Sequence, residues 1–384
     1  MTNLDRYNDN WLIEKKYCFG FVKYSRTMAD GFNYRLQLFG LPIASRRYEH
    51  DRPTIQCLFL KYRLNVAHRT KRLIKDIKNE KLKHYDHVFV LFNNLGETRL
   101  FLESLRDLVP DNSLFVYTKR YHGELLKMIL PNKETLFYPE FFSVHFQRDA
   151  SPVLNSNPTV HLIGCIDYFK EYETSMQTMD TAHIPHFYRN YLEKVGGAIG
   201  YPVKPKTVKP LKVLELERKR ALEKIEILIG RSKFVIVCNE TFSNINLKPA
   251  FYRELCRQLY AQGYKVLFNS TGINSSNCLG IASSMSIQEL VEIASYAEFV
   301  IGIRSGILDV LASNAKAIVA LYTPFRKRPG FDELSAEKVL AAFTLSKVDF
   351  ENKPKIREII VDDDTPAKEI ITRILQGESI RGQH

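Results

Sequence analysis

The sequence predicts an α/β protein made of two doubly wound domains in series, preceded by a small basic segment. Two observations support this prediction. Short apolar runs alternate with amphipathic stretches, and this alternation occurs twice, on either side of a proline- and lysine-rich connection at 203–213 (VKPKTVKPLKV). Strands that alternate with helices form parallel sheets with right-handed crossovers. The chain has 384 residues, of which 45% are apolar, and it can therefore bury two cores.

Residues 1–84 are expected to form a basic accessory segment of short strands plus a helix. Three apolar runs within 17–64 alternate aromatic and aliphatic side chains, as strands do, and Gly40 and Pro42 interrupt the middle run. The lysine- and arginine-rich stretch 60–83 predicts a helix that leads into the first compact domain.

The first domain is predicted over residues 85–205. Its expected elements are, in order, a strand at 88–92, a helix at 98–108, a strand at 113–117, a helix at 120–130, a strand at 135–138 and a closing helix within 186–203. A glycine-containing turn at 93–97 joins the first strand to the first helix. Because ligands bind at the carboxyl ends of parallel strands, this turn is expected at the mouth of a cleft.

The second domain, predicted over residues 206–360, repeats this order. Its expected elements are a helix at 214–229, a strand at 234–240, a helix at 250–263, a strand at 264–270, a helix at 286–296, a strand at 298–303 and a strand at 317–324. The C-terminal segment 361–384 carries one more amphipathic helix at 365–375. Two Rossmann-like domains in series leave a cleft between the carboxyl ends of their sheets, where a ligand is expected.

The most informative stretch is 284–324, SMSIQELVEIASYAEFVIGIRSGILDVLASNAKAIVALYTP. It predicts a helix, a buried strand, a tight Ser305-Gly306 turn, a second helix and a second strand. The turn is therefore expected at the carboxyl end of a parallel strand and at the start of a helix. Free backbone N–H groups and the helix dipole attract a phosphate at such a position.

The formal net charge of +12 indicates an anionic partner. The alternative is a solvated basic surface that keeps the protein soluble. The sequence contains no zinc finger, no RNP-type strand and no tract alternating basic and aromatic residues, so nucleic acid is not the expected partner. An anionic glycolipid or a phosphorylated saccharide suits the charge better.

The sequence favours a protein that stays inside the cell. Its six cysteines have no CxxC spacing and are interpreted as reduced core residues. The N-terminus does not have the pattern of a signal peptide, and no apolar run approaches the roughly 20 residues that span a bilayer. The sequence contains no HExxH, GxxxxGK or full GxGxxG motif. It therefore lacks the metal- or phosphate-binding motifs of zinc proteases, P-loop NTPases and nicotinamide-dependent enzymes.

Several segments in order resemble one family. NNLGETRLFLESLRDLVPDNSLFVYT is similar to the first unit of the bacterial lipopolysaccharide heptosyltransferases, which reads strand, LGD, helix, Pro, strand. KPAFYRELCRQLYAQGYKVLF, SIQELVEIASYAEFVIGIRSG and AIVALYTP resemble later segments of the same family. The resemblance covers about residues 85–330 and implies a GT-B fold glycosyltransferase, which transfers a sugar from a nucleotide sugar bound by the second domain to an acceptor held by the first.

The resemblance implies that Glu97 is the general base. Glu97 stands where the family has its Asp, and a carboxylate there would take the proton of the acceptor hydroxyl. In the alternative interpretation, Glu97 is an N-terminal helix residue favoured by the helix dipole.

The donor is expected to bind residues of two loops of the second domain. The candidates are Thr241, Ser243, Asn246 and Lys248 after the strand 234–240, and Arg304, Ser305, Gly306 and Asp309 around the later turn. In the family a lysine often contacts phosphate in this loop, and the resemblance aligns that lysine nearest Asn246. Lys248 can take this role only if the alignment is shifted by two residues. The first loop is alternatively an ordinary strand-to-helix connection rich in turn formers.

The segment GIRSGILDVLA departs from the family, which has Asp before Ser-Gly and His three residues after the Gly. Here these positions hold Arg304 and Asp309. A guanidinium can pair with phosphate or with a sugar carboxylate, so the donor need not be ADP-heptose. The alternative is an ion pair between Arg304 and Asp309 that fixes the loop.

Asn94, Gly96, His183 and His186 are the candidate acceptor-binding residues, with surface positions as the alternative for the two histidines. No metal and no cofactor is expected. The favoured function is a metal-independent, inverting glycosyltransferase of a bacterial surface glycan (lipopolysaccharide, capsule or similar), cytoplasmic and in peripheral contact with the inner membrane face. Two alternatives stay open, an epimerase-like enzyme that modifies the nucleotide sugar and a non-catalytic protein that binds anionic glycans.

Overall fold

The computed structural model of the chain describes residues 12–17, 22–27, 33–38, 41–49, 52–57, 60–63, 84–91, 94–117, 119–137, 160–163, 166–198, 203–239, 241, 244–269, 280–283, 285–325, 332–362 and 365–376. The chain divides into two compact units. The strand unit contains Arg6–Lys83 and Glu140–Ser156, and the α/β unit contains Met1–Asp5, His84–Pro139 and Asn157–His384.

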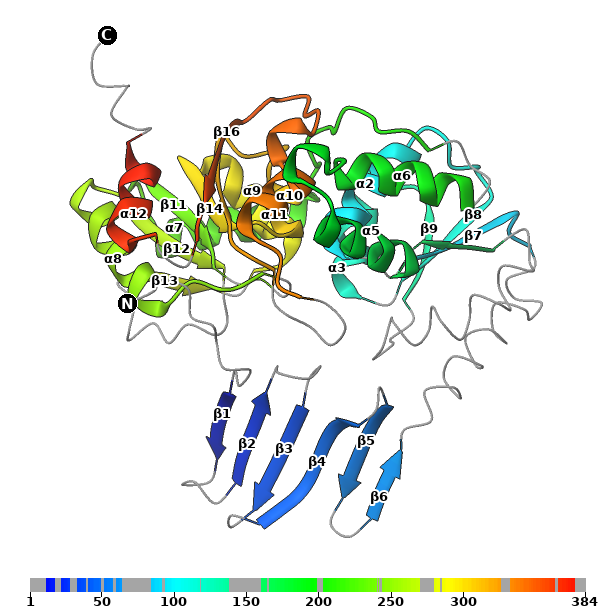
Figure 1. Cartoon of the computed structure of the whole chain (residues 1–384), viewed down its shortest axis with the longest axis horizontal. Helices are drawn as coiled ribbons and strands as arrows, with labels where there is room; N and C mark the ends of the chain where they lie inside the picture. The colour runs from blue at the N-terminus through cyan, green and yellow to red at the C-terminus, as the bar shows by residue number, and fades with distance from the viewer. Residues whose placement is uncertain are drawn as a thin grey trace. The chain divides into compact units, whose positions relative to one another are not determined.

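The first domain of the α/β unit is built on a four-stranded parallel sheet in the order β10-β7-β8-β9. Figure 1 labels β7, β8 and β9 of this sheet. The strands are β7 (His87–Leu91), β8 (Ser113–Tyr117), β9 (Glu134–Phe137) and β10 (Val160–Ile163). The helices are α2 (Leu95–Leu105), α3 (Arg120–Ile129), α5 (Ile166–Thr178), the short 3-10 helix η2 (Thr181–His183) and α6 (Phe187–Ala198).

The central strands of this sheet are apolar nearly throughout, which is typical of parallel strands covered on both faces. β7 reads HVFVL and β8 reads SLFVY. Phe89 and Phe115 are fully buried and stack across the two strands with ring centroids 5.0 Å apart. α2 buries Phe101, Leu102 and Leu105, so the start of this helix is held rigidly at the carboxyl end of β7.

The second domain is built on a six-stranded parallel sheet in the order β13-β12-β11-β14-β15-β16. The strands are β11 (Phe234–Cys238), β12 (Lys265–Asn269), β13 (Ile281–Ser283), β14 (Phe299–Ile303), β15 (Ala317–Tyr322) and β16 (Lys355–Ile360). In sequence order this is 3-2-1-4-5-6, the doubly wound order, so the topological switch point lies between β11 and β14.

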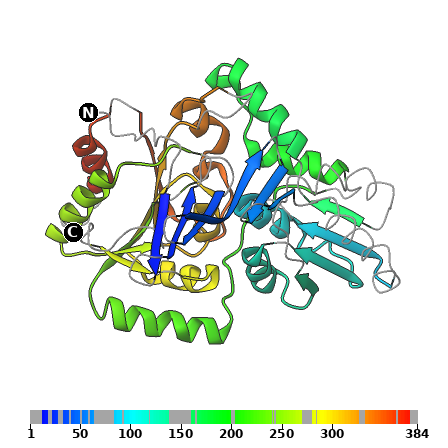
Figure 2. The ribbon, with the colours of Figure 1, turned by 90° about the horizontal axis from the view of Figure 1, so that it is seen from below.

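Six α-helices and one 3-10 helix of the second domain lie in the described residues. They are α7 (Glu215–Leu228), α8 (Pro249–Ala261), α9 (Ile287–Tyr296), α10 (Gly306–Leu311), α11 (Ala336–Phe343), the 3-10 helix η4 (Leu345–Lys347) and α12 (Ala367–Leu375). α8 starts with a proline, and Ser286 and Glu289 form a capping box before α9. α7 lies beside α9 (Figure 2).

The C-terminal helix α12 is part of the second domain. Ile370, Ile371 and Ile374 are buried in the apolar core that also contains Phe251 and Leu255 of α8. The predicted second domain ends at residue 360 and so leaves out α12, although α12 contributes side chains to the core of this domain.

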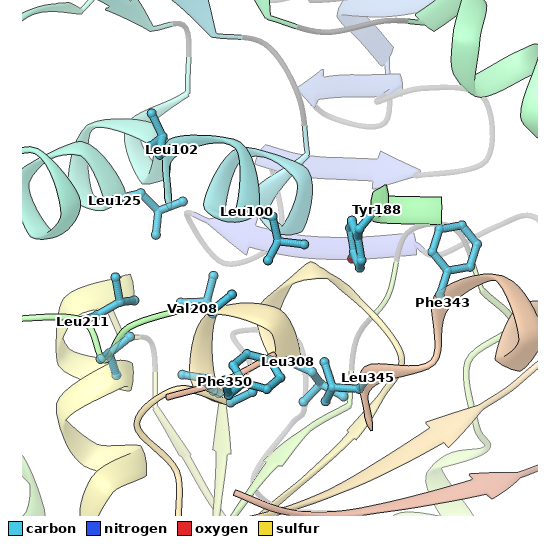
Figure 3. Close-up of a cluster of buried hydrophobic side chains, with 14 of the residues drawn as sticks. Leu100, Leu102, Leu125, Tyr188, Val208, Leu211, Leu308, Phe343, Leu345 and Phe350 are labelled. Carbon is cyan, nitrogen blue, oxygen red and sulfur yellow. The ribbon is translucent and has the colours of Figure 1, made fainter. Parts of the chain in front are cut away.

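One apolar cluster joins the two domains of the α/β unit (Figure 3). Leu100 of α2 and Tyr188 of α6 belong to the first domain, and Leu308 of α10 and Phe343 of α11 belong to the second. The connection between the domains contributes Val208 and Leu211, and Leu345 and Phe350 are buried in the same cluster. The two domains are therefore packed together through side chains as well as through the chain itself.

Hydrogen bonds fix the connection to both domains. Arg99 of α2 donates to the carbonyl oxygen of Lys209 at 2.5 Å and also pairs with the buried carboxylate of Glu103. On the other side, the backbone N–H of Leu211 donates to Asn314 Oδ1 at 2.9 Å. The connection that the sequence indicates as a linker is thus an ordered part of the structure.

The strand unit contains a six-stranded antiparallel sheet in the sequential order β1 to β6. The strands are β1 (Leu12–Tyr17), β2 (Val22–Thr27), β3 (Asn33–Leu38), β4 (Leu41–Glu49), β5 (Arg52–Cys57) and β6 (Leu60–Arg63). The helix predicted over 60–83 is wrong at its start, because residues 60–63 pair with β5 in a hairpin. Residues 64–83 lie outside the described residues.

The buried His161, which contacts His87 in the first sheet, predicts a dependence of stability on pH. His161 Nε2 lies 2.9 Å from His87 Nδ1, and burial, together with His87, lowers the pKa of His161 to about 4. Below the ordinary value of 6.5 the unfolded chain takes up a proton that the folded chain binds only near pH 4, so stability is lost as pH falls through this window. This shift corresponds to about 3 kcal/mol.

The measurement is the free energy of unfolding in urea between pH 7.5 and 4.5, compared for the parent protein and His161→Phe. We expect the parent to lose more stability than the variant as the pH falls. His183→Phe is the control, because the His183 side chain is 79% exposed and should behave like the parent. Equal slopes for the parent and His161→Phe would contradict the prediction.

Candidate functional site

Glu97 lies in the first turn of α2, directly after the carboxyl end of β7. Its Oε1 atom accepts a hydrogen bond from Asn94 Nδ2 at 3.4 Å. Burial raises the pKa of the Glu97 carboxyl, and the nearby charge of Asp309 adds to this rise, whereas the hydrogen bonds of the helix start and the charge of Lys119 oppose it. A carboxylate whose pKa is raised binds a proton more strongly, as a general base requires.

Two glycines allow the starts of α2 and α10 to touch. A Cβ atom on Gly96 would overlap Asp309 Oδ2 and would lie 3.0 Å from the Cα atom of Gly306. A Cβ atom on Gly306 would in turn overlap the backbone nitrogen of Gly96. Only glycine fits at both positions, and the contact places the Ser305-Gly306 turn of the second domain next to Glu97 of the first.

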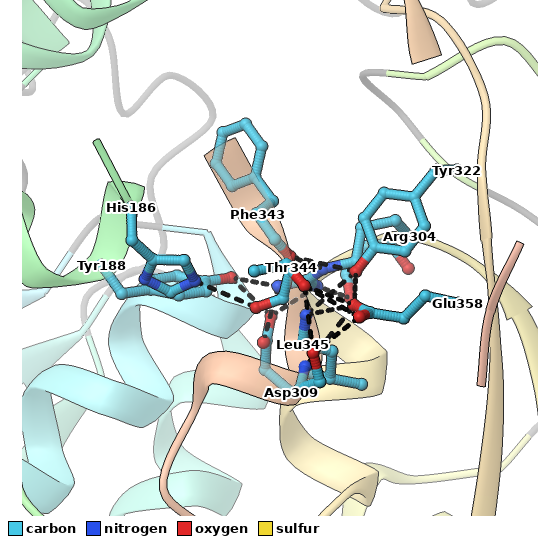
Figure 4. Close-up of polar contacts among 11 residues, drawn as sticks. His186, Tyr188, Arg304, Asp309, Tyr322, Phe343, Thr344, Leu345 and Glu358 are labelled. Atoms are coloured by element: carbon cyan, nitrogen blue, oxygen red, sulfur yellow. Dashed lines mark hydrogen bonds and ion pairs between the residues drawn. The ribbon is translucent and has the colours of Figure 1, made fainter. Parts of the chain in front are cut away.

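Arg304 is buried and uses all of its N–H groups within the protein (Figure 4). Two of them donate to the carboxylate of Asp309 at 2.9 and 2.8 Å. The other three donate to the carbonyl oxygens of Phe343 and Ser305 and to the hydroxyl of Tyr188 at 2.8, 3.0 and 2.9 Å, respectively. A guanidinium has five N–H donors, so in this arrangement none is left for a donor phosphate.

Arg304 and Asp309 therefore form the ion pair that the sequence offered as the alternative. The side chain of Asp309 is fully buried. Burial lowers the pKa of Arg304, but the charge of Asp309, the electrostatic effects of Tyr188 and Tyr322 and the hydrogen bond with Asp309 together raise it by more, and the net shift is upward. Direct donor contacts of Arg304 and Asp309 stay a prediction that would require this pair to open.

Tyr188 and His186 connect the first domain to this pair. The Tyr188 hydroxyl donates to Asp309 Oδ2 at 2.6 Å, and burial raises the pKa of Tyr188 well above its ordinary value. His186 Nε2 lies 3.0 Å from the carbonyl oxygen of Thr344. A carbonyl oxygen only accepts, so His186 donates through Nε2–H, and burial lowers the pKa of the imidazole, which favours its neutral form.

The network continues into the second domain through Glu358. Tyr322 donates to Glu358 Oε1 at 2.6 Å and to the same Phe343 carbonyl that Arg304 contacts, at 3.2 Å (Figure 4). Thr344 and the backbone of Leu345 also donate to Glu358. Burial raises the pKa of Glu358, but these hydrogen bonds lower it by more. The loop after α11 is thus fixed against β15 and β16.

Hydrogen bonds of its own side chains order the predicted donor loop after β11. Asn246 Oδ1 accepts from the backbone N–H of Thr241 at 3.0 Å, and Asn244 Nδ2 donates to the carbonyl oxygen of Thr323 at 3.1 Å. Lys248 occupies the N-cap position of α8. Ser243 lies outside the described residues. These contacts agree with the interpretation of an ordered strand-to-helix loop, and the donor role of Thr241, Asn246 and Lys248 stays a prediction.

Two buried polar atoms lie at the switch point of the six-stranded sheet. Asn239 follows β11 directly, and Ser305 follows β14 after one residue; these strands pair with Cys238 opposite Gly302. In the described part of the chain, Asn239 Oδ1 and Ser305 Oγ have no hydrogen-bond partner. Buried polar atoms are nearly always satisfied, so unsatisfied ones at the expected ligand position indicate a missing partner.

The candidate acceptor residues are not all in one place. Asn94 and Gly96 lie beside Glu97, and His186 lies next to Tyr188, with ring centroids 5.6 Å apart. His183 is exposed and pairs with Asp180 at 3.6 Å instead. The alternative of a surface position is therefore right for His183 and wrong for His186.

The structure adds residues that the sequence patterns did not single out. Lys119 and Tyr121, at the start of α3, are close enough to Glu97 for their charges to interact. Tyr188 is a further addition. It sits at an ordinary core position of an amphipathic helix, so no local pattern distinguishes it. Asn239 had a usable signal, because it is the polar residue that directly follows a buried strand.

The described residues form no group of three or more His, Cys, Asp or Glu side chains that could hold a metal ion. Among the helices in the same part of the chain, none has the length and apolarity needed to cross a bilayer.

No family model matches the sequence, and no curated protein matches it. The fold is similar to that of solved structures. E. coli ADP-heptose LPS heptosyltransferase II is 14% identical, and the similarity covers 76% of this chain and 99% of that one with a TM-score of 0.45. A family 9 glycosyl transferase from Veillonella parvula is 15% identical, with 76% and 89% covered and a TM-score of 0.46. A putative UDP-N-acetylglucosamine 2-epimerase from Listeria monocytogenes is 9% identical, with 77% and 88% covered and a TM-score of 0.42.

Proposed function

We propose that the protein is a glycosyltransferase that moves a sugar from a nucleotide-sugar donor to a saccharide acceptor, with Glu97 as the general base. The observation that carries the proposal is the contact between Gly96 and Gly306, which brings a carboxylate of raised pKa on one domain to the strand-end turn of the other. The segment resemblance to the lipopolysaccharide heptosyltransferases supports the same assignment of Glu97.

The donor diphosphate is proposed to bind at the switch point between β11 and β14. Asn239 and Ser305 supply polar groups there that lack a partner, and the backbone N–H groups of the Ser305-Gly306 turn add donors. Lys248 at the start of α8 is the proposed cation. In this proposal Arg304 and Asp309 hold the turn in position through their ion pair.

In the proposed reaction an oxygen of the acceptor hydroxyl attacks the anomeric carbon of the donor sugar. The bond from that carbon to the diphosphate oxygen breaks, the diphosphate leaves with the electron pair, and the hydroxyl proton passes to the carboxylate of Glu97. Direct attack inverts the configuration. Backbone and side-chain donors neutralise the leaving group, so the proposal requires no metal.

The proposed acceptor is an anionic saccharide or glycolipid of a bacterial surface glycan, because the net charge of +12 favours such a partner. The proposed location is the cytoplasm, with peripheral contact at the inner face of the membrane.

Calorimetric titration with UDP, ADP, GDP and CDP tests the donor site. We expect one of these nucleotides to bind, and Ser305→Ala to weaken its binding by about three- to tenfold, since a hydrogen bond contributes roughly 1 kcal/mol. Ser295→Ala is the matched control, because Ser295 donates to a backbone carbonyl within α9. If none of the four nucleotides produces heat, the donor site is wrong.

A further inference from the structure

A groove of about 1480 Å³ lies between residues of the two domains, and His186 and Tyr188 are part of its lining. It is formed by α2, α6, the connection between the domains and the segment that follows η4. Five basic side chains line it against two acidic ones, Glu193 and Asp349. The basic residues are Arg189, Lys204, Lys206, Lys209 and Lys347.

Three of these cations are not neutralised within the described residues. Arg189 pairs with Glu193 at 3.5 Å, and Lys206 pairs with Asp107 at 2.9 Å. The other three basic residues form no ion pair with a carboxylate of the described chain; they are Lys204, Lys209 and Lys347. Asp349 accepts a hydrogen bond from the Thr207 hydroxyl at 2.5 Å. The groove thus has an excess of positive charge, and like charges lining a concave surface raise the local concentration of anions.

The groove is lined by both polar and apolar side chains. Leu100 and Val208 are among its apolar residues, and they are only 5% and 1% exposed. Four of the five basic side chains are lysines, which bind phosphate as point charges. The volume exceeds the roughly 300–1,000 Å³ of ordinary small-molecule pockets, and the groove can therefore hold a bulky polar body.

We propose that this groove binds an organic ligand that carries several phosphate groups. The site is distinct from the donor and base residues and does not depend on the proposed reaction. Its cations come from both domains, since Arg189 belongs to α6 and Lys347 to η4. A polyanion that contacts both would link the two domains next to the His186 contact with Thr344, and it would raise the midpoint of thermal unfolding by mass action.

The test uses the full chain and inositol hexakisphosphate as the probe, at about 150 mM salt, where weak surface attraction is screened. Calorimetric titration and thermal unfolding are measured for the parent, Lys209→Ala/Lys347→Ala and Lys219→Ala/Lys233→Ala. The last variant loses the same charge at exposed lysines outside the groove. We expect Lys209→Ala/Lys347→Ala to weaken binding about tenfold or more, because each charge-assisted contact contributes more than an ordinary hydrogen bond, and the control to change it less than about twofold.

Neutral maltose and a single-stranded oligonucleotide complete the design. Maltose should not bind, and the oligonucleotide should not displace the probe. Equal losses in the two double variants would show that the whole basic surface attracts the probe, and the proposal would be wrong. It would also be overturned if the probe failed to bind, or if the oligonucleotide competed with it at similar concentration.

Discussion

Replacing Glu97 with glutamine is expected to lower kcat/KM by roughly 10²–10⁴-fold, the usual contribution of a general base. The amide keeps the size of the side chain and its hydrogen bond with Asn94, but it cannot accept the proton of the acceptor hydroxyl. Nucleotide binding should be retained, because Glu97 belongs to the first domain and the donor site to the second. Initial rates of nucleoside diphosphate release and calorimetric titration of the same nucleotide measure the two quantities separately.

The pH dependence and a control sharpen this test. The carboxyl must be ionised to act as a base, so the rate should rise with pH, and the midpoint should lie above the ordinary value of about 4.3 because burial raises the pKa of Glu97. Glu171→Gln is the matched control on an exposed glutamate of the first domain, 68% exposed, and should retain full turnover. Glu97→Gln with unchanged turnover would exclude Glu97 as the base.

Replacing Arg304 with methionine is expected to lower the free energy of unfolding by about 3–5 kcal/mol. The substitution leaves the carboxylate of Asp309 fully buried, with the Tyr188 hydroxyl as the partner that remains. It also removes the donor to the Phe343 carbonyl, so the loop after α11 loses one of its contacts. Urea unfolding followed by far-UV circular dichroism measures the loss.

A double variant separates the lost charge pair from lost packing. Arg304→Met/Asp309→Leu removes both charges, and we expect it to be more stable than Arg304→Met alone, since no unpaired charge stays buried. Arg257→Met is the control on an exposed pair, because Arg257 and Glu254 are 61% and 35% exposed, and it should cost less than about 1 kcal/mol. If the two single variants lose equal stability, the buried pair has no special role.

Periodic apolar patterns predicted most of the α/β elements. The strand expected at 113–117 has these bounds in the structure, and the helices expected at 214–229 and 286–296 differ from α7 and α9 by one residue at most at either end. The strand involved is buried and therefore reads as a continuous apolar run, and α9 begins with a capping box. The fold class is confirmed by the two parallel sheets.

Two of the strands that were missed have weak local patterns. β10 is a four-residue strand, and its place beside β7 depends on a parallel pairing of residues 72 positions apart, as between Val160 and Val88. β16 reads KIREII and mixes charged with apolar residues, and it lies partly exposed at the edge of its sheet. Short or edge strands bury little surface of their own, so long-range pairing decides whether they form.

The candidate site shows the same division. Placing Glu97 and the Ser305-Gly306 turn at strand ends required only the order of strands, turns and helices, and the structure brings these residues together. The residues next to Arg304 in the sequence could not show that all of its N–H groups have partners within the protein. Its partner Tyr188 lies 116 positions away on a helix of the other domain.

The sequence by itself determined the two doubly wound domains, their turns and the glycines that permit close approach, because side-chain periodicity and backbone freedom act over a few residues. The tertiary structure alone decided that Arg304 pairs with Asp309 and Tyr188, that Asn239 and Ser305 keep unsatisfied polar atoms, and that a basic groove opens beside α2. These features depend on which buried polar groups meet across the domain interface, and packing between distant segments sets those distances.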